Sequence, residues 1–209
     1  MNNKTKKSLV IFGAGGHSSV LIDTLFLLEE NIVGIVDPKL SKTQKHMNIP
    51  AIDEESFLSR FDPEEIDIVN GIGSLPESSI RSDLSKRFRK LNYKFKTIVH
   101  PSALVSESIL VSEGSQIMAG SVIQPNTSIG IDTIINTSAS IDHDCRIGNY
   151  SHIAPGVIIS GNVSVGENCF IGTGSVIINN IKIGNNTLIA AGSTIFEDLP
   201  ESSRIIQKK

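Results

Sequence analysis

The stretch IINTSASIDHDCRIGNYSHIAPGVII, from Ile134 to Ile159, contains the pattern that decides the fold of this chain. It lies in a region where every sixth residue is valine or isoleucine. Neither a helix period near 3.6 nor a strand period of 2 would select this row alone. A six-residue repeat predicts a parallel β-helix, in which each short strand stacks on the next coil. The row consists of Val99, Val105, Val111, Ile117, Ile123, Ile129, Ile135, Ile141, Ile147, Ile153, Ile159, Val165, Ile171, Ile177, Ile183, Ile189 and Ile195.

The other positions of the repeat agree with this interpretation. Residues two positions before each aliphatic are mostly small or β-branched, as a crowded interior corner requires. Glycine recurs one position after the aliphatic, often followed by Asn or Glu, and these are turn residues. The sequence therefore predicts a prism in which three six-residue faces make one coil. The small row runs Ser115, Ser121, Thr127, Thr133, Ala139, Cys145, Ser151, Val157, Val163, Cys169, Ser175, Ile181, Thr187 and Ser193, and the glycines are Gly130, Gly148, Gly166, Gly172 and Gly184.

Residues 1–97 lack the six-residue row and form a different domain. Short apolar runs there alternate with helical patterns, which is typical of a parallel sheet. We expect strands at 8–12, 31–36, 66–69 and 93–99, a helix after the glycine-rich run that begins at Gly13, and a helix at 80–91. This order predicts a Rossmann-like half-domain at 1–97. The six-residue row predicts a parallel β-helix domain at 98–209.

The glycine loop between the first strand and the first helix partly matches the dinucleotide-binding pattern. Gly13-x-Gly15 is present, but Ser18 holds the third glycine position. Asp37 ends the second strand, where an acid commonly meets a ribose hydroxyl. Such a loop directs backbone N–H groups at phosphate. It is either a tight turn without a ligand or the site of a nucleotide-bearing ligand. The half-domain is too small for a whole NAD-binding fold, which disfavours hydride transfer.

Composition and charge limit the possible partners. The chain has 209 residues, a formal net charge of −3 and a pI near 5.9, which gives no electrostatic case for nucleic acid or an anionic membrane. The apolar run Leu9-Val10-Ile11-Phe12 is too short for a signal peptide or a membrane span. We therefore expect a cytoplasmic protein with neither nucleic-acid nor membrane partners.

His143 is the strongest candidate for a catalytic group. It occupies the second position after Ile141, in a turn whose side chains should point outward, and it lies between Asp142 and Asp144. An adjacent carboxylate fixes the tautomer of an imidazole and raises its basicity, which suits a general base. The alternative is a solvated polar turn. Gly161 has the same repeat position 18 residues later, so we expect it about 4.8 Å away along the axis, with a backbone N–H for an acyl oxygen.

The remaining histidines carry weaker signals. His17 lies in the glycine loop, within reach of a ligand there. His46 lies in a polar stretch and is expected to be a loop residue, and His100 is expected to be structural. His152 precedes Ile153, so it should lie on an outer strand face that is exposed in a monomer and suits a subunit contact.

Cysteine chemistry and metal binding are less favoured. Cys145 and Cys169 both fall in the small interior row, where a cysteine behaves as an inert small hydrophobe rather than a nucleophile. His143 and His152 are nine residues apart, a spacing that does not supply the three or four ligands of a zinc site. We therefore expect no metal.

Together these features resemble the bacterial left-handed β-helix acetyltransferases that carry an N-terminal nucleotide-binding domain. That family includes enzymes that N-acetylate UDP-4-amino-4,6-dideoxy sugars (the PglD type), GDP-perosamine N-acetyltransferases, and sialic-acid O-acetyltransferases (the NeuD type). The resemblance covers nearly the whole chain, and it departs at Ser74, where many members have Asn. The matching residues are Gly13 to His17, Asp37-Pro38, Gly71-Ile72-Gly73 with Arg81 downstream, His100 to Ala103, and Asn136 to His152.

The resemblance implies a homotrimer with acetyl-CoA, the acetyl donor, lying between two β-helices. His143 matches the general base of the family, and Asp144 matches the acid that orients it. The residues that match the acetyl-CoA site are Asn136, His152 and the backbone of Gly161. Those that match the nucleotide-sugar site are Gly13, Gly15, Gly16, His17, Asp37, Gly73 and Arg81.

The function expected on these grounds is transfer of acetyl from acetyl-CoA to the amine of a nucleotide-linked 4-amino-4,6-dideoxy sugar, in bacterial surface-glycan biosynthesis. A direct attack by the amine needs a base but no covalent enzyme intermediate. Two alternatives remain open. One is O-acetylation of a sialic or legionaminic-type acid, which the same His-Asp pair would serve. The other is a non-catalytic, nucleotide-binding trimeric scaffold.

Overall fold

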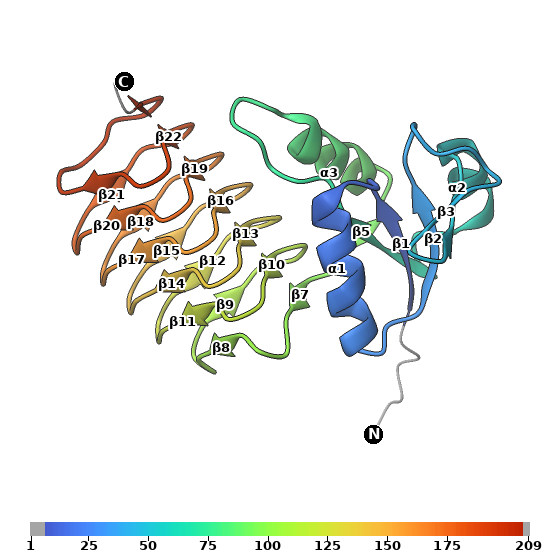
Figure 1. Cartoon of the computed structure of the whole chain (residues 1–209), viewed down its shortest axis with the longest axis horizontal. Helices are drawn as coiled ribbons and strands as arrows, with labels where there is room; N and C mark the ends of the chain where they lie inside the picture. Colours follow the sequence, from blue (N-terminus) through green and yellow to red (C-terminus); the bar gives the residue numbers. More distant parts are fainter. Residues whose placement is uncertain (1–6, 207–209) are drawn as a thin grey trace. The chain divides into compact units, whose positions relative to one another are not determined.

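Figure 1 shows the computed structural model of the chain, which describes residues 7–206. The chain forms two compact units. One contains residues 7–73 and 78–96, and the other contains residues 74–77 and 97–206. The first is an α/β fold and the second is a parallel β-helix, so the predicted fold class is confirmed. Within the described range, no helix is long and apolar enough to cross a membrane.

The α/β unit is built on four parallel strands in the order β2-β1-β5-β6. Side chains on both faces of β1 are buried, as expected of a parallel strand covered on both sides. The chain changes direction across the sheet between β1 and β5, and ligands of such folds bind outside the carboxyl ends of the strands at this point. The strands are β1 (Ser8–Phe12), β2 (Ile32–Val36), β5 (Ile66–Asn70) and β6 (Lys94–Phe95).

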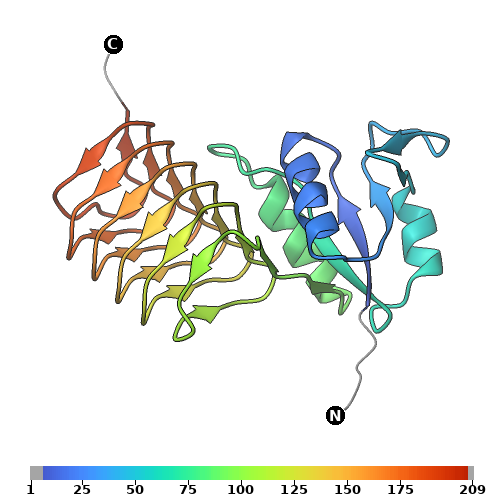
Figure 2. The same ribbon diagram turned by 60° about the horizontal axis from the view of Figure 1, so that its bottom comes forward.

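Three helices pack around this sheet, α1 (Gly16–Leu27), α2 (Glu54–Arg60) and α3 (Ile80–Lys90) (Figure 2). Aromatic side chains join two of them to β1. The ring of Phe12 lies 5.0 Å from that of Phe57 in α2 and 4.6 Å from that of Phe88 in α3. These rings, all nearly inaccessible to solvent, form the core on one side of the sheet.

The sequence pattern did not predict α2, although its start carries a clear signal. Asp53 caps the helix, and its carboxylate accepts a 3.1 Å hydrogen bond from the backbone N–H of Ser56. Hydrogen bonds from Ser56 hold the pKa of Asp53 well below its usual range. An Asp cap followed by Glu54 and Glu55 in the first turn is a helix-start signature that could have revealed this element.

The single strand predicted at 93–99 is wrong. Its first half is β6, which pairs with β5 of the α/β unit, and its second half is β7 (Ile98–Val99), which pairs with the first coil of the β-helix. A second small element is the hairpin of β3 (Lys45–His46) and β4 (Ile49–Pro50). Both residues of its turn have positive φ, as a two-residue hairpin turn requires.

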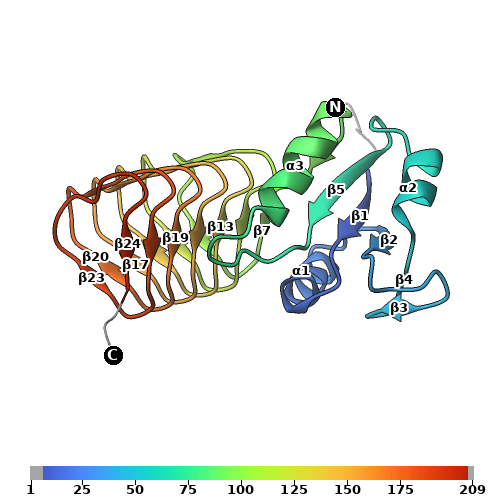
Figure 3. The same ribbon diagram turned by 90° about the horizontal axis from the view of Figure 1, so that it is seen from above.

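The β-helix has three flat faces, each a sheet of two-residue parallel strands (Figure 3). Face 1 contains β7, β10 (Gln116–Ile117), β13 (Ile134–Ile135), β16 (His152–Ile153), β19 (Phe170–Ile171), β22 (Leu188–Ile189) and β24 (Arg204–Ile205). Face 2 contains β8 (Leu104–Val105), β11 (Val122–Ile123), β14 (Ser140–Ile141), β17 (Ile158–Ile159), β20 (Val176–Ile177) and β23 (Thr194–Ile195). Face 3 contains β9 (Leu110–Val111), β12 (Ser128–Ile129), β15 (Arg146–Ile147), β18 (Ser164–Val165) and β21 (Lys182–Ile183).

Residues 18 apart are neighbours on each face. On face 1, Ile117 pairs with Ile135, which pairs with Ile153, and the same aliphatic row continues through Ile171. All these side chains are buried in one continuous core. The constant spacing of six residues in the sequence is thus the distance along the chain from one corner of the prism to the next, and three corners make one coil.

Every sixth residue from Gly114 to Gly192 has left-handed backbone, three positions after the aliphatic of the repeat. The φ values include 60° at Asn126, 60° at Asp144 and 58° at Asn162. Asn, Asp and Gly tolerate this conformation best, which explains why these residue types recur there. The glycines one position after the aliphatic have a different role. A Cβ added at Gly148 would lie 2.5 Å from the carbonyl carbon of Gly166, so glycine is needed there for close approach of successive coils.

Side chains of the small row, which lie at the corners of the prism, donate hydrogen bonds to backbone carbonyls in the turns of the following coil. Ser151 Oγ donates to the carbonyl of Gly166 at 2.8 Å, and Thr133 Oγ1 donates to that of Gly148 at the same distance. The thiols of Cys145 and Cys169 occupy the same position and donate at 3.2 Å to the carbonyls of Ser160 and Gly184. These contacts tie each corner to the next one along the axis.

Removing one corner hydroxyl should destabilise the β-helix. Ser151 is buried, and its hydroxyl also accepts a 3.0 Å hydrogen bond from the backbone N–H of Cys169. In Ser151→Ala we expect a loss of about 1–3 kcal/mol in the free energy of unfolding, because two buried backbone groups lose their partner. Urea denaturation measures this. Ser164→Ala, on the outward side of β18, is the matched control, and equal stability of the two variants would contradict the role of the corner row.

Candidate active site

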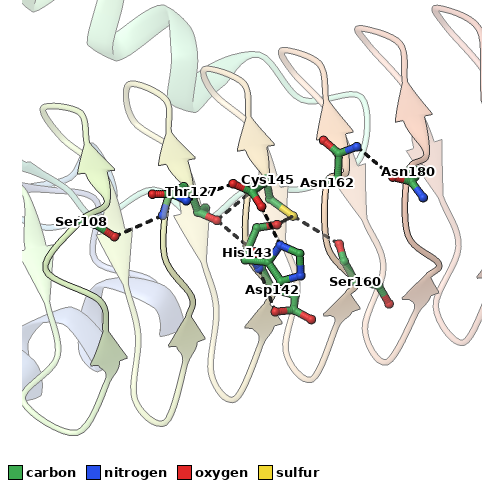
Figure 4. Close-up of polar contacts among 10 residues, drawn as sticks. Ser108, Thr127, Asp142, His143, Cys145, Ser160, Asn162 and Asn180 are labelled. Atoms are coloured by element: carbon green, nitrogen blue, oxygen red, sulfur yellow. Dashed lines mark hydrogen bonds and ion pairs between the residues drawn. The ribbon is translucent and has the colours of Figure 1, made fainter.

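His143 lies in the turn between β14 and β15, on the row of turns that joins face 2 to face 3. We call this row, which includes residues 142–145, 160–163 and 178–181, the 2–3 edge. Figure 4 shows the imidazole on this edge beside Asp142. The His143 side chain is 57% exposed, so the outward orientation expected from the repeat is what the structure has.

The ring of His143 is held by its neighbour in the chain. Nδ1 lies 2.7 Å from Oδ2 of Asp144. A carboxylate only accepts hydrogen bonds, so Nδ1 carries the proton in this contact. In the neutral ring, Nε2 then has the free electron pair and is the basic nitrogen. On the other side, the Asp142 carboxylate accepts a 2.8 Å hydrogen bond from the backbone N–H of His143.

Both carboxylates make His143 more basic. The hydrogen bond to Asp144 raises the pKa of His143 above its ordinary value, and the charge of Asp142 adds to this. The same hydrogen bond lowers the pKa of Asp144, and a second one, from Asn126, lowers it further. The arrangement keeps Asp144 ionised and strengthens His143 as a proton acceptor.

Gly161 lies directly beneath the ring of His143, as the repeat predicted. A Cβ added to Gly161 would lie 2.7 Å from Cε1 and 2.8 Å from Nε2 of His143. Gly161 itself is buried. The imidazole therefore rests on the backbone of the next coil.

Asn136 and His152 form a second polar pair, away from the 2–3 edge. Asn136 lies at the start of the turn that joins face 1 to face 2, and His152 lies on face 1. Nδ2 of Asn136 is 3.1 Å from Nε2 of His152, and Oδ1 of Asn136 accepts from the N–H of Thr137. Because Nδ2 can only donate, Nε2 of His152 is an acceptor and its neutral ring is protonated at Nδ1. One chain thus places this pair and His143 on different edges of the prism.

The expectation that His152 is exposed in a single chain is wrong. Its side chain is only 7% exposed, and its ring packs edge-on at 5.1 Å against that of Phe170 in the next coil. The pattern of the repeat indicated the direction of the side chain but not what would cover it.

The two cysteines are buried, and burial raises the pKa of both thiols. A raised pKa disfavours the thiolate that a nucleophile needs. Within the described residues, no group of three or more His, Cys, Asp and Glu side chains is arranged to hold a metal ion.

In the α/β unit, the loops after β1 and β5 meet at the carboxyl ends of the strands. A Cβ added to Gly13, which has φ of 104°, would lie 3.0 Å from the carbonyl carbon of Gly71, and one added to Gly73 would lie 3.4 Å from Cβ of His17. At Gly13, both the positive φ and the close approach of the Gly71 backbone favour glycine. Gly15 caps α1 without a side chain, and no acidic residue occupies the first turn, which leaves the helix start open to an anion.

Asp37 and Arg81 hold these loops in place. The Asp37 carboxylate accepts from the backbone N–H of Ala14 at 2.7 Å and from that of Lys39 at 2.8 Å. Arg81 is buried, and its Nη1 donates to the carbonyls of Asn70 at 2.9 Å and Ile72 at 2.7 Å. Asp37 therefore holds the loop after β1, and the buried Arg81 holds the loop after β5.

His46 is a polar residue near the glycine loop that the sequence did not single out. It lies in the β3–β4 hairpin, not in a loop, and its Nε2 is 3.0 Å from Oγ of Ser19 in the first turn of α1. His100 does have a structural contact, because its Nδ1 accepts from the backbone N–H of Ser102 at 3.0 Å. No sequence signal connects residues 19 and 46.

Comparison with known proteins identifies the two units. Residues 8–88 match the PglD N-terminal domain family, and residues 162–197 match the bacterial transferase hexapeptide family of six repeats. Among curated proteins, none matches the chain.

Solved structures match nearly the whole chain. PerB from Caulobacter crescentus, in complex with CoA and GDP-perosamine, is 33% identical with a TM-score of 0.85, and the match covers 94% of this chain and 92% of that one. The acetyltransferase domain of PglB from Neisseria gonorrhoeae, in complex with acetyl coenzyme A, is 30% identical with a TM-score of 0.86 and 95% of each chain covered. WeeI from Acinetobacter baumannii, 20% identical with a TM-score of 0.83 over 96% of this chain and 97% of its own, shares the fold.

These matches define an acyltransferase built on a left-handed β-helix. The chain belongs to the family of PglD- and PerB-type sugar N-acetyltransferases.

The effect of Asp144 on His143 can be measured directly. In Asp144→Asn, which suits the left-handed backbone equally well, we expect the pKa of His143 to fall because the amide no longer offers a charged acceptor. An NMR titration of the histidine ring signals gives this pKa. Asp142→Asn is the control and should lower it less. An unchanged pKa in Asp144→Asn would show that the contact is not formed in solution.

Proposed function

We propose that this enzyme transfers the acetyl group of acetyl-CoA to the amine of a nucleotide-linked 4-amino-4,6-dideoxy sugar, with His143 as general base, in bacterial surface-glycan biosynthesis. The observation that carries this is the exposed His143, oriented by Asp144 at 2.7 Å and left with a basic Nε2. The matches to a perosamine N-acetyltransferase and to a PglB acetyltransferase domain support the choice of an amine acceptor and of acetyl-CoA as donor.

The proposed reaction is a direct transfer. The neutral amine of the sugar attacks the thioester carbonyl, forming a C–N bond, while Nε2 of His143 accepts the proton that the nitrogen loses. The C–S bond then breaks, and coenzyme A leaves as a thiol by taking the proton held on Nε2 of His143, which restores the neutral base. A backbone N–H of Gly161 stabilises the oxyanion between these steps. Because the carboxylate of Asp144 faces Nδ1, the imidazolium formed in the reaction is stabilised where it arises.

The nucleotide-sugar is proposed to bind the α/β unit at the carboxyl ends of β1 and β5. Gly13, Gly15, Gly16 and Gly73 would present backbone there, with His17 beside them. Asp37 retains lone pairs for a ribose hydroxyl while it holds Ala14. Arg81 would act by holding the loop that Gly73 ends.

The acetyl-CoA site is proposed to combine two copies of the chain. Asn136 and His152 lie toward the edge between faces 1 and 2, whereas His143 and Gly161 lie on the 2–3 edge. These two edges flank face 2. If three parallel prisms direct face 2 at a common axis, the 2–3 edge of one copy meets the opposite edge of the next. A homotrimer thus assembles all four residues around one coenzyme.

Exposed aliphatic side chains on face 2 support this assembly. Leu104 is 69% exposed and Ile158 is 50% exposed. Val122 and Val176 belong to the same outward row, in which Ser140 separates Val122 from Ile158. A row of apolar side chains on a flat face favours contact with another protein surface.

The shared site predicts complementation between inactive chains. We expect His143→Ala and Asn136→Ala each to lose most activity, and a mixture refolded together to recover about one quarter of the wild-type rate, because that fraction of randomly assembled interfaces is intact. Thiol release from acetyl-CoA measures the rate. Chains refolded separately and then mixed are the control, and no gain on joint refolding would contradict the shared site.

A panel of acceptors tests the proposed function. We expect rapid release of free thiol from acetyl-CoA with one of the UDP-, GDP- or dTDP-linked 4-amino-4,6-dideoxy sugars and none with free sialic acids. In His143→Ala, turnover should fall by about 10²–10⁴-fold. In the wild type, kcat/KM should rise with pH through the raised pKa of His143, since only the neutral ring accepts a proton.

Two results would overturn this assignment. Turnover with sialic acids alone would establish O-acetylation instead, and a near-normal rate in His143→Ala would exclude His143 as the base. His143→Asn should still bind CoA. In the Caulobacter relative, variants with one histidine replaced by asparagine or alanine form complexes with CoA and GDP-perosamine.

A further inference from the structure

The His143–Asp144 pair is exposed, yet it contacts both neighbouring coils. On the side of the preceding coil, Nδ2 of Asn126 donates to Oδ1 of Asp144 at 3.1 Å, while Oδ2 of the same carboxylate faces His143. On the side of the following coil, the ring of His143 covers Gly161. Exposed side chains on turns usually sample several rotamers, so contacts of this kind decide whether the pair has one geometry.

We propose that Asn126 and Gly161 are positioning residues for the His143 imidazole, Asn126 by fixing the Asp144 carboxylate and Gly161 by leaving the space that the ring occupies. This inference rests on the proposed function, since it concerns the group assigned there as the base. Neither residue needs to contact the substrate for this role, which is separate from any use of the Gly161 backbone N–H.

Asn126 suits its role because of where the repeat places it. It has the same turn position as Asp144, 18 residues earlier, and both have φ of 60°. The Asp144 carboxylate therefore has one oxygen bound across the coil boundary and one bound to the ring, so it cannot rotate without losing a contact. Asn126 is itself anchored, because its backbone N–H donates to Oγ of Ser108 at 3.2 Å.

Side-chain hydrogen bonds between successive coils also occur further along this edge, and one of them supplies a control. Asn162 donates through Nδ2 to Oδ1 of Asn180 at 2.8 Å, in the same turn position two coils away from Asn126 (Figure 4). Asn180 has φ of 64°, so it shares the backbone conformation of Asn126 but does not contact Asp144.

Gly161 suits its role for a steric reason and not a conformational one. Its φ is not in the left-handed region, so an alanine there is not strained by its backbone. The added Cβ would instead overlap the ring at 2.7–2.8 Å. Because the ring is the exposed end of a side chain, it can move away at little cost in stability, but it would then leave Asp144.

The charged surroundings of the ring are simple. Asp142 and Asp144 lie in its own turn, and the adjoining thiol of Cys145 is turned inward to the carbonyl of Ser160. The neighbouring turns on this edge, 124–127 and 160–163, contribute no titratable side chain. A change in the titration of His143 therefore reports on its distance from the two carboxylates.

The test compares Gly161→Ala and Asn126→Gly with two controls. Asn179→Ala is in the repeat position of Gly161 one coil further on, and Asn180→Gly is in that of Asn126. For Gly161→Ala we expect kcat to fall by about 10²-fold, since a small misplacement of a catalytic group has this effect. For Asn126→Gly, which tolerates positive φ, we expect a fall of about 10-fold. An NMR titration should show a lower pKa of His143 in Gly161→Ala, and the thermal unfolding midpoints should match those of the controls.

The possible results separate this inference from the proposed function. Normal kcat together with an unchanged pKa of His143 in Gly161→Ala would overturn the inference. A lowered pKa with normal kcat would uphold the positioning and overturn His143 as the base. If Gly161→Ala does not fold, Asn126→Gly decides alone, and a kcat equal to that of Asn180→Gly would then overturn the role of Asn126.

Discussion

The hydrogen bonding of each coil to the next is the constraint on which this enzyme depends. Backbone N–H groups meet carbonyls one coil away on all three faces, as between Ile134 and Ser151 or between Arg146 and Val163. The resulting register makes residues 18 apart neighbours for the length of the β-helix. A side chain on a turn therefore has fixed neighbours in the preceding and the following coil, and two residues 18 positions apart in the chain can contact each other.

His143, the proposed general base, shows how this register can order an exposed side chain. A general base has to be accessible to its substrate, and an accessible side chain is ordinarily poorly ordered. Here Asp144 follows directly in the chain, Asn126 comes from the coil before and Gly161 from the coil after. The α/β unit orders a loop differently, because the buried Arg81 donates hydrogen bonds to backbone carbonyls of Asn70 and Ile72 and so holds the loop after β5.

The sequence was most informative where contacts are local or strictly periodic. The buried row, the small corners and the pair of His143 with Asp144 could all be read from spacing or adjacency. Asn126 was missed because an asparagine in a turn is ordinary in composition, and only the register shows that it faces a carboxylate. The start of α2 was visible in Asp53 and overlooked, whereas the hydrogen bond between Ser19 and His46 joins two elements that no sequence period relates.

The sequence by itself determined the repeat, the alternation of strands and helices before it, and the pairing of His143 with Asp144, because each depends on residues at short or regular separations. The tertiary structure alone decided that His152 is buried, that Asp37 and Arg81 are bound to backbone, and that His143 and Asn136 lie on different edges of one prism. Those properties depend on which surfaces meet after the chain has coiled, and a periodic pattern describes the direction of a side chain without describing its neighbours.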